Sequence, residues 1–431
     1  MSNRTEEPDS NFNTDIWVVD ADKGEKEGGL IQITSNPGAD YSPAWSPDGR
    51  SIAYVTSIQP EVIWYATNHL AVISADGNGT PRLLTKEIDR NVSNPTFLPD
   101  GRTIEFILED QGEEQLASIR NDGSRFTRHI KDGVSVNSYH RHNTTVAVNM
   151  GRFSYPAELY TLSGNRLTKL TDVNRSYSER VATAPFEEIR FNSKDGTEIH
   201  GFLVRPVGYE PGKRYPTILW IHGGPVAQYS HSYNFTAELF AANGYAVLLI
   251  NPRGSSGYGQ AFSEILFADW GNKDFEDVMA AVDHAIAIGV ADPEKLGVGG
   301  WSYGGILTNY VITKTGRFKG AISGASETLL RSNYGHDHYQ RHWEAELGLP
   351  WETPEKWERL SSFNDVANVT TPTLWIGGAD DWNVPIIGSE QMYQAMRRLG
   401  IETQLVVYPG EHHGIRNMSF QKDRYERYLD W

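Results

Sequence analysis

The sequence contains no cysteine, and this absence removes several kinds of chemistry at once. Disulfides, thiol catalysis and cysteine-ligated zinc sites are excluded. No apolar run approaches the roughly 20 residues that a membrane-spanning helix needs. The polar segment 1–9 also lacks the apolar centre of a signal peptide, which predicts a cytoplasmic location and no membrane partner.

Basic residues are also fewer than acidic residues. The chain has 39 Lys and Arg against 55 Asp and Glu, for a formal net charge of −16, which argues against nucleic acid or an anionic membrane as a partner. Its 431 residues, 39% of them hydrophobic, are enough for globular folding but too many for one ordinary core. The sequence therefore predicts two domains.

The first predicted domain, residues 1–183, is all-β and repetitive. A Pro-Asp-Gly turn at 47–49 recurs at 99–101, and a second strand-like element recurs from Ile16, Leu70, Leu116 and, more weakly, Leu159. The period of about 45–55 residues is that of a four-stranded propeller blade. We expect a β-propeller-like domain of about four blades, with an irregular β-sandwich as the alternative.

The second predicted domain, residues 187–431, alternates strands and helices. Continuous apolar runs suit parallel strands covered on both faces, and helical stretches at 274–288 and 389–399 lie between them. This pattern predicts a doubly wound, mostly parallel α/β sheet, with a hinge near 181–186. The apolar runs are 218–221, 246–250, 296–299, 320–323, 373–376 and 404–407.

Residues 300–304 read Gly-Trp-Ser-Tyr-Gly, between the apolar run 296–299 and a helical stretch at 305–312. This is the G-x-S-x-G nucleophile elbow in strand–turn–helix context. The strained turn requires small neighbours and exposes the serine hydroxyl above the sheet. Ser302 is therefore the candidate nucleophile.

A serine nucleophile needs a general base and an orienting acid. The predicted strand 373–376 is followed by Asp380 and Asp381, and the run 404–407 by His412 and His413. The order Ser, Asp, His is that of α/β-hydrolases, and both doublets lie at strand C-terminal ends. Chemistry alone does not separate the members of either doublet.

Oxyanion donors are expected from two backbone groups. His-Gly-Gly-Pro at 222–225 follows a predicted strand and offers the N–H of Gly224, and the residue after the nucleophile offers the N–H of Tyr303. A glycine turn without function is the alternative for the first of these. His222 itself is expected to be structural.

These motifs, with Asn-Pro-Arg-Gly at 251–254 and Trp-Gly-Asn-Lys-Asp at 270–274, resemble the prolyl oligopeptidase family of serine peptidases over 187–431, the acylaminoacyl-peptidase-like branch above all. The resemblance implies an N-terminal propeller that caps the active site. It also selects Asp381 as the acid and His413 as the base. It implies that Asn383 binds a substrate carbonyl. The segment 332–351 is rich in Tyr, His and Trp, including Tyr334 and Trp343, and is expected to line a side-chain pocket, with aromatic core packing as the alternative.

The function implied is hydrolysis of short peptides through an acyl-enzyme, with no metal or cofactor. The alternatives are a carboxylesterase with the same triad and an inactive fragment that acts as a binding module. Propellers of this family have seven or eight blades, so this one is expected to be an incomplete, unclosed propeller. An unclosed propeller exposes an unpaired strand edge through which a homo-oligomer can form. Glu113-Glu114 beside Gly112 is read as a turn rather than as the amine clamp of the dipeptidyl-peptidase branch.

Overall fold

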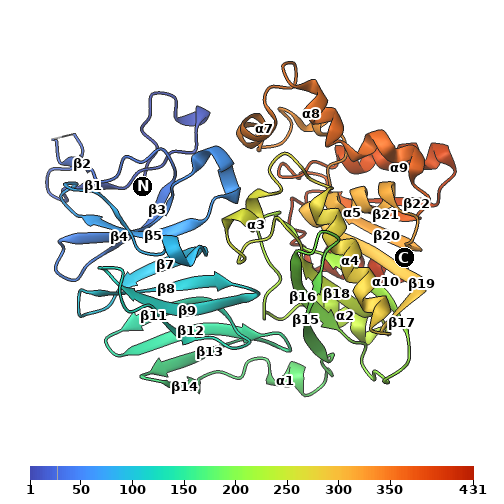
Figure 1. Cartoon of the computed structure of the whole chain (residues 1–431), viewed down its shortest axis with the longest axis horizontal. Helices are drawn as coiled ribbons and strands as arrows, with labels where there is room; N and C mark the ends of the chain where they lie inside the picture. Colours follow the sequence, from blue (N-terminus) through green and yellow to red (C-terminus); the bar gives the residue numbers. More distant parts are fainter. Residues whose placement is uncertain (27) are drawn as a thin grey trace. The chain divides into compact units, whose positions relative to one another are not determined.

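The computed structural model describes residues 1–26 and 28–431 and divides the chain into two compact units. The first unit comprises Met1–Ser178, Ser230–Tyr233 and Ser256–Glu264; the second comprises Glu179–Tyr229, Asn234–Ser255 and Ile265–Trp431 (Figure 1). The predicted ranges 1–183 and 187–431 did not include the two short excursions. They belong to the first unit because their backbone bonds to it, as in Gln111 N–H to Gly257 O at 3.0 Å and His231 N–H to Gly112 O at 2.8 Å.

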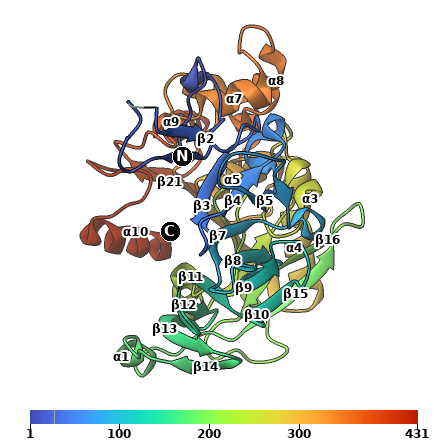
Figure 2. The same cartoon turned by 90° about the vertical axis from the view of Figure 1, so that its left-hand side faces the viewer.

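The first unit consists of short antiparallel sheets in sequence order (Figure 2). β1 pairs with β2, β3 to β6 form a four-stranded sheet, and β7 to β10 and β11 to β14 are two further four-stranded groups joined by one parallel pairing of β11 with β9. The strands are β1 (Trp17–Val19), β2 (Leu30–Gln32), β3 (Asp40–Trp45), β4 (Ser51–Ser57), β5 (Asn68–Ser74), β6 (Arg82–Leu83), β7 (Val92–Phe97), β8 (Thr103–Asp110), β9 (Glu113–Arg120), β10 (Thr127–Ile130), β11 (Ser135–His142), β12 (Thr145–Arg152), β13 (Tyr155–Ser163) and β14 (Arg166–Lys169). Its helices are η1 (Pro8–Ser10), η2 (Pro60–Tyr65), η3 (Lys86–Ile88), α1 (Arg175–Ser178) and α3 (Gln260–Glu264).

The repeat seen in the sequence has a structural meaning. Its later copies are β5, β9 and β13, the third strand of each four-stranded group, and its first copy is β1. The Pro-Asp-Gly turns are confirmed: they connect β3 to β4 and β7 to β8, with Gly49 and Gly101 at φ 69° and 64°. Within residues 1–26 and 28–178, the unit therefore holds three blade-sized groups and the two-stranded β1–β2 piece.

Glu113 and Glu114 do not lie in a turn, contrary to expectation. The turn ends at Gly112, and both glutamates begin β9. Their carboxylates accept hydrogen bonds from the Gly133 N–H, just before β11, and from the hydroxyl of Ser135, the first residue of β11. The pair thus holds two neighbouring groups of strands together.

The second unit is built on an eight-stranded sheet in the order β15-β16-β18-β17-β19-β20-β21-β22. β15, β16 and β18 pair antiparallel, and β18 and all the strands that follow it in the sheet pair parallel. The strands are β15 (Phe186–Asn192), β16 (Glu198–Val204), β17 (Tyr215–Ile221), β18 (Ala246–Asn251), β19 (Ala291–Trp301), β20 (Gly320–Gly324), β21 (Thr373–Gly378) and β22 (Thr403–Tyr408). All six predicted apolar runs lie in strands, while β15 and β16 were not predicted.

Helices connect the parallel strands, as the alternating pattern predicted. The predicted helices 274–288 and 389–399 are α4 (Lys273–Ala287) and α9 (Ile387–Leu399), and α5 (Tyr303–Lys314) packs on β19 and β20. The other helices are α2 (Phe235–Ala242), α6 (Leu330–Asn333), α7 (Gln340–Leu347), α8 (Pro354–Arg359), η4 (Ser362–Asn368) and α10 (Met418–Asp430). The sequence order of strands and helices brings the C-terminal ends of β19, β21 and β22 to one edge of the sheet.

Candidate active site

Ser302 is the single residue between β19, which ends at Trp301, and α5, which begins at Tyr303. Its backbone has φ 62° and ψ −127°, a conformation that a non-glycine residue adopts only under strain. The Ser302 N–H donates to Gly324 O at 2.9 Å, and its carbonyl accepts the N–H of Ile306 at 2.9 Å to begin the helix. The predicted nucleophile elbow is therefore present in the backbone.

Two glycines allow the strand and helix to approach this closely. A β-carbon built on Gly304 would lie 2.1 Å from the carbonyl oxygen of Ile221, and one on Gly300 would lie 2.6 Å from the same oxygen. Neither contact is tolerable for a real side chain. The G-x-S-x-G spacing is thus explained by the passage of α5 over the end of β17.

The two doublets after β21 and β22 separate clearly in space. His413 Nδ1 lies 2.8 Å from Asp381 Oδ2, and Asp381 is only 5% exposed. The other Asp381 oxygen accepts the N–H groups of Asn383 and Val384 at 2.9 and 2.8 Å, which fixes the carboxylate in its loop.

The neighbouring residues make a different contact. The exposed His412 donates from Nδ1 to the backbone carbonyl of Asp380 at 2.6 Å, and the side chain of Asp380 is exposed. A carbonyl oxygen can only accept a hydrogen bond, so this contact holds the two loops together but offers no carboxylate to the ring. The imidazole–carboxylate pair of the site is His413 with Asp381.

The serine and histidine loops are joined through Trp301. Its indole N–H donates to the carbonyl of His413 at 3.0 Å, and the two rings are 6.3 Å apart. The glycine loop after β17 packs against the turn at Ser302, because a β-carbon built on Gly223 would be 3.3 Å from the Ser302 Cβ. Three segments far apart in sequence therefore meet around the turn at Trp301 and Ser302.

His222 lies in this glycine loop but is buried in a neutral environment. Its Nδ1 donates to Gly223 O at 2.7 Å, and its Nε2 lies 3.0 Å from the Ser255 hydroxyl. Burial lowers the pKa of His222 to about 4, so the ring is neutral at physiological pH. A buried neutral ring held at both nitrogens has the features of a structural residue.

The predicted substrate-binding residues fall into two groups. Asn383 accepts a hydrogen bond from the Tyr339 hydroxyl, and the buried Trp343 donates to Asp337 Oδ2 at 2.9 Å. Asp337 also accepts the N–H of Tyr339 at 2.7 Å, so Asn383 and Trp343 are joined through one short segment. Tyr339 and Asp337 were not singled out from the sequence, which offers no spacing rule for such contacts.

Tyr334 lies elsewhere in the same region. Its hydroxyl donates to Glu344 at 2.7 Å, and its ring meets Trp351 and Trp357 edge-on at 6.0 and 5.6 Å. The structure therefore places Tyr334 in an aromatic cluster with α7 and α8. It does not bring Tyr334 to Asn383 through a hydrogen bond among the described residues.

Glu327 is a buried acid that sequence analysis did not find. It is 1% exposed, and neither carboxylate oxygen makes a hydrogen bond of normal distance and angle to the described residues. Burial, and then the nearby Asp337 carboxylate, raises the pKa of Glu327 well above 4.5. Glu327 is therefore protonated in the folded protein at pH values where it is ionised in the unfolded chain.

This difference predicts a pH-dependent stability. The neutral form of Glu327 stabilises the fold fully below pH 4.5, and the contribution is lost as the pH rises toward the raised pKa. Relative to Glu327→Gln, the wild-type free energy of unfolding should fall by up to about 1.4 kcal/mol per pH unit in that range. Urea unfolding at pH 5 and pH 7 measures this, with exposed Glu355→Gln as control. An equal difference between wild type and Glu327→Gln at both pH values would contradict it.

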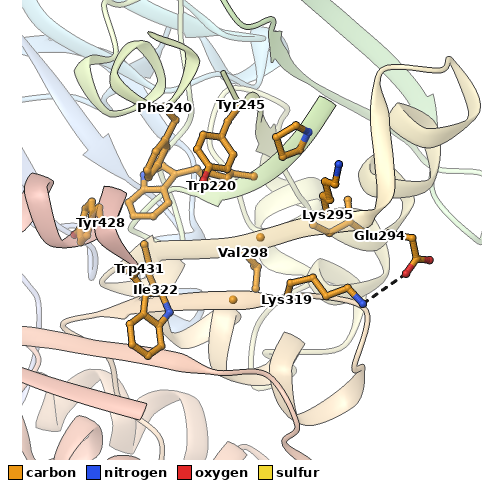
Figure 3. A pocket seen from close by; sticks show the side chains of 15 residues that line it. Trp220, Phe240, Tyr245, Glu294, Lys295, Val298, Lys319, Ile322, Tyr428 and Trp431 are labelled. Atoms are coloured by element: carbon orange, nitrogen blue, oxygen red, sulfur yellow. Dashed lines mark ion pairs between the residues drawn. The ribbon is translucent and has the colours of Figure 1, made fainter. Parts of the chain in front are cut away.

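A separate hollow of about 330 Å³ lies on the face of the same sheet beside α10 (Figure 3). Aromatic side chains surround it, with Lys295, Lys319 and Glu294 around its mouth; the aromatic residues are Trp220, Phe240, Tyr245, Tyr428 and Trp431. Its β19 lining, residues 294–298, comes from the middle of the strand, upstream of Ser302. It is therefore a feature apart from the nucleophile elbow.

Within 1–26 and 28–431, no group of three or more His, Asp or Glu side chains is arranged to hold a metal ion. In the same residues, no helix combines the length and apolar character needed to cross a membrane.

A mostly parallel eight-stranded sheet with a serine elbow, a buried carboxylate and a paired histidine at its strand ends defines an α/β-hydrolase domain. Residues 231–431 match the sequence profile of the prolyl oligopeptidase family, Peptidase_S9. The chain thus carries a domain of the prolyl oligopeptidase family, as the sequence motifs predicted.

The chain is also similar in sequence to curated peptidases. The chain is 35% identical over 342 residues to the uncharacterized peptidase YuxL of Bacillus subtilis, which covers 77% of this chain and 51% of that protein. It is 24% identical over 451 residues to dipeptidyl-peptidase 5 of Aspergillus fumigatus, covering 100% of this chain and 62% of that protein. The chain therefore spans between about half and three fifths of the length of these relatives.

Solved structures share the fold. An acylaminoacyl peptidase in complex with Z-Gly-Gly-Phe-chloromethyl ketone superimposes with a TM-score of 0.84 and 24% identity, over 94% of this chain and 64% of that one. A Mycobacterium tuberculosis puromycin-hydrolyzing peptidase gives a TM-score of 0.77 and 21% identity, over 94% and 63%. The predicted fold class, an α/β-hydrolase domain preceded by a partial β-propeller, is confirmed.

Proposed function

We propose that this chain is a serine peptidase that cleaves short peptides, with Ser302 as nucleophile, His413 as general base and Asp381 as orienting acid. The observation that carries the proposal is the 2.8 Å pair of His413 with the buried Asp381, tied through Trp301 to the strained turn at Ser302. The family profile over 231–431 and the peptidase names of the relatives support it.

In the proposed reaction, His413 takes the proton of the Ser302 hydroxyl as the oxygen attacks the peptide carbonyl. Asp381 accepts the Nδ1–H, which leaves Nε2 free of its proton to act as base, and then stabilises the imidazolium. His413 next protonates the leaving amine. Water, activated by the same histidine, hydrolyses the acyl-enzyme and regenerates the serine.

The backbone N–H groups of Gly224 and Tyr303 are proposed to bind the oxyanion that forms at the substrate carbonyl. Donors of this kind contribute about 3–4 kcal/mol each to transition-state stabilisation in comparable sites. Asn383 is proposed to bind a substrate backbone carbonyl, and Trp343 and Tyr334 to belong to the region that receives the substrate side chain. The proposed substrates are short peptides, including acylated ones, by analogy with the acylaminoacyl peptidase fold.

The test pairs labelling with turnover. Intact-mass labelling by a fluorophosphonate should modify the wild-type chain once and leave Ser302→Ala unmodified. The anilides of an acetyl-amino acid, a free dipeptide and a blocked prolyl peptide, with a nitrophenyl ester beside them, then identify the substrate class. Turnover of the ester alone would replace the peptidase by an esterase, and absence of labelling in folded protein would overturn a catalytic role altogether.

A further inference from the structure

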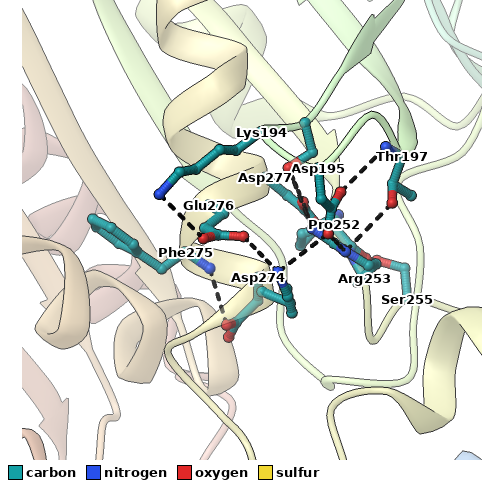
Figure 4. Close-up of polar contacts among 12 residues, drawn as sticks. Lys194, Asp195, Thr197, Pro252, Arg253, Ser255, Asp274, Phe275, Glu276 and Asp277 are labelled. Atoms are coloured by element: carbon teal, nitrogen blue, oxygen red, sulfur yellow. Dashed lines mark hydrogen bonds and ion pairs between the residues drawn. The ribbon is translucent and has the colours of Figure 1, made fainter.

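We propose that Asp274 and Asp277, three residues apart at the start of α4, are positioning residues that orient the two backbone donors of the oxyanion site. The inference rests on the proposed function, because it gives these donors a catalytic use. Asp277 acts through Arg253 and the loop after β18 (Figure 4). Asp274 acts through the hydroxyl of Tyr303. Residues three apart on a helix share one face, so a single helix start serves both donors.

Asp277 holds Arg253 at both its side chain and its backbone. Arg253 Nη2 donates to Asp277 Oδ1 at 2.6 Å, Nε donates to Oδ2 at 3.0 Å, and the Arg253 N–H also donates to Oδ2 at 2.8 Å. Asp277 is fully buried and the Arg253 side chain is 4% exposed. A two-pronged guanidinium–carboxylate contact of this kind fixes direction as well as distance. The loop after β18, which contains Arg253, is thereby anchored.

Other partners complete the surroundings of Arg253. Its Nη1 donates to Asp195 Oδ2 at 2.6 Å, and Asp195 is also paired with Lys273 at 3.1 Å. The Ser193 hydroxyl donates to Asp277 Oδ1 at 2.6 Å. Every part of the guanidinium fork therefore has an acceptor, and the loop has little freedom to move.

The anchored loop reaches the first oxyanion donor through Ser255 and His222. Ser255 N–H donates to Pro252 O at 3.0 Å, and the Ser255 hydroxyl lies 3.0 Å from His222 Nε2. The opposite ring nitrogen donates to Gly223 O at 2.7 Å. This last contact is the decisive one, because the Gly223 carbonyl and the Gly224 N–H belong to the same planar peptide group. Fixing the carbonyl oxygen fixes the direction in which the Gly224 N–H points.

The second donor is held more directly. The Tyr303 hydroxyl donates to Asp274 Oδ2, and Asp274 is fully buried. The carboxylate also accepts the N–H groups of Gly271 and Phe275 at 3.0 and 2.9 Å, so it is rigid with respect to the start of α4. Trp270 packs edge-on against the Tyr303 ring at 5.4 Å. Because Tyr303 is the first residue of α5, a fixed phenol restrains the turn that carries its N–H.

The test removes one link on the way to each donor without touching a donor N–H. Tyr303→Phe deletes the hydroxyl that binds Asp274. Ser255→Ala deletes the hydroxyl that lies 3.0 Å from His222 Nε2 and 2.7 Å from Pro252 O. Both variants keep every backbone group. Each variant should lower kcat and the rate constant of fluorophosphonate labelling by about 10- to 100-fold, with KM changed less than about twofold, because oxyanion donors act mainly in the transition state.

Two matched controls remove comparable groups outside this chain of contacts. Tyr310→Phe deletes another buried tyrosine hydroxyl on α5, which bonds to Leu360 O at 2.6 Å. Ser361→Ala deletes a buried serine hydroxyl that bonds to Trp357 O at 2.7 Å. Both controls should keep kcat within about threefold of the wild type. Direct replacement of Asp277 is avoided because it would leave the buried Arg253 charge without its partner.

The outcomes separate the inference from the function on which it rests. Wild-type kcat in Tyr303→Phe and Ser255→Ala, with wild-type protein labelled at Ser302, would overturn the positioning role alone. Equal losses in the two controls, or losses that follow thermal stability, would also overturn it in favour of general structural damage. An unlabelled wild-type protein would overturn the proposed function, and the positioning role would fall with it.

Discussion

Replacing Asp381 with asparagine is expected to lower kcat for peptide anilide hydrolysis by about four orders of magnitude. The buried carboxylate accepts the Nδ1–H of His413 at 2.8 Å through one oxygen and two backbone N–H groups through the other. An amide cannot accept at both positions. Its NH₂ group must face either the two backbone donors or the ring, and in the second case it favours the tautomer whose Nε2 already carries a proton. That tautomer cannot take the proton of Ser302.

The neighbouring acid provides the matched control. Asp380→Asn alters an exposed side chain one residue away and leaves the backbone carbonyl that binds His412 in place. We expect its kcat to stay within about threefold of the wild type. Steady-state kinetics on both variants, with circular dichroism to establish folding, decide the matter. A larger loss for Asp380→Asn than for Asp381→Asn would assign the acid to the other member of the doublet.

Gly304→Ala is expected to destabilise the protein by more than about 4 kcal/mol or to prevent folding. An alanine inside an exposed helix normally gains about 1 kcal/mol over glycine. At Gly304, however, the added β-carbon would lie 2.1 Å from the carbonyl oxygen of Ile221 and 2.9 Å from that of His222. Both obstacles are backbone atoms at the end of β17, so relief requires α5 to move away from the sheet. The elbow would be lost with it.

Gly297→Ala is the control for this substitution. Gly297 lies on β19, the strand that leads to the elbow, and a β-carbon there would meet Ile218 Cγ1 at 3.5 Å, an ordinary contact. We expect its free energy of unfolding to stay within about 1 kcal/mol of the wild type. Urea unfolding of the three proteins measures the difference. Wild-type stability in Gly304→Ala would show that the close passage of α5 over β17 is not what requires glycine there.

Local patterns predicted much of this molecule. The six apolar runs became strands, the Gly-Trp-Ser-Tyr-Gly segment became a strained turn with Ser302 at φ 62°, and the Pro-Asp-Gly segments became turns between strands. Each of these depends on residues close together in the sequence, as continuous apolar runs or short motifs that the sequence displays directly. The antiparallel strands β15 and β16 were not found, because they interrupt the βα alternation on which that prediction relied.

The Asp and His doublets show the limit of what local patterns can predict. Asp380 and Asp381, like His412 and His413, are identical in type and adjacent, so no spacing argument separates them. The resemblance to the peptidase family selected Asp381 and His413, and in the fold these two make the contact between carboxylate and imidazole. Adjacent side chains point in different directions, and only the path of both loops decides which pair meets.

By itself, the sequence determined the class of fold, six of the eight strands of the second unit's sheet and the identity of the serine at the elbow, because these follow from short-range patterns. Only the tertiary structure decided how Asp274 meets Tyr303, how Asp277 meets Arg253, and how Glu327 comes to be buried beside Asp337. These contacts join separate elements whose approach depends on the packing of the whole sheet. A buried polar group acquires its role from the partners that burial leaves within its reach.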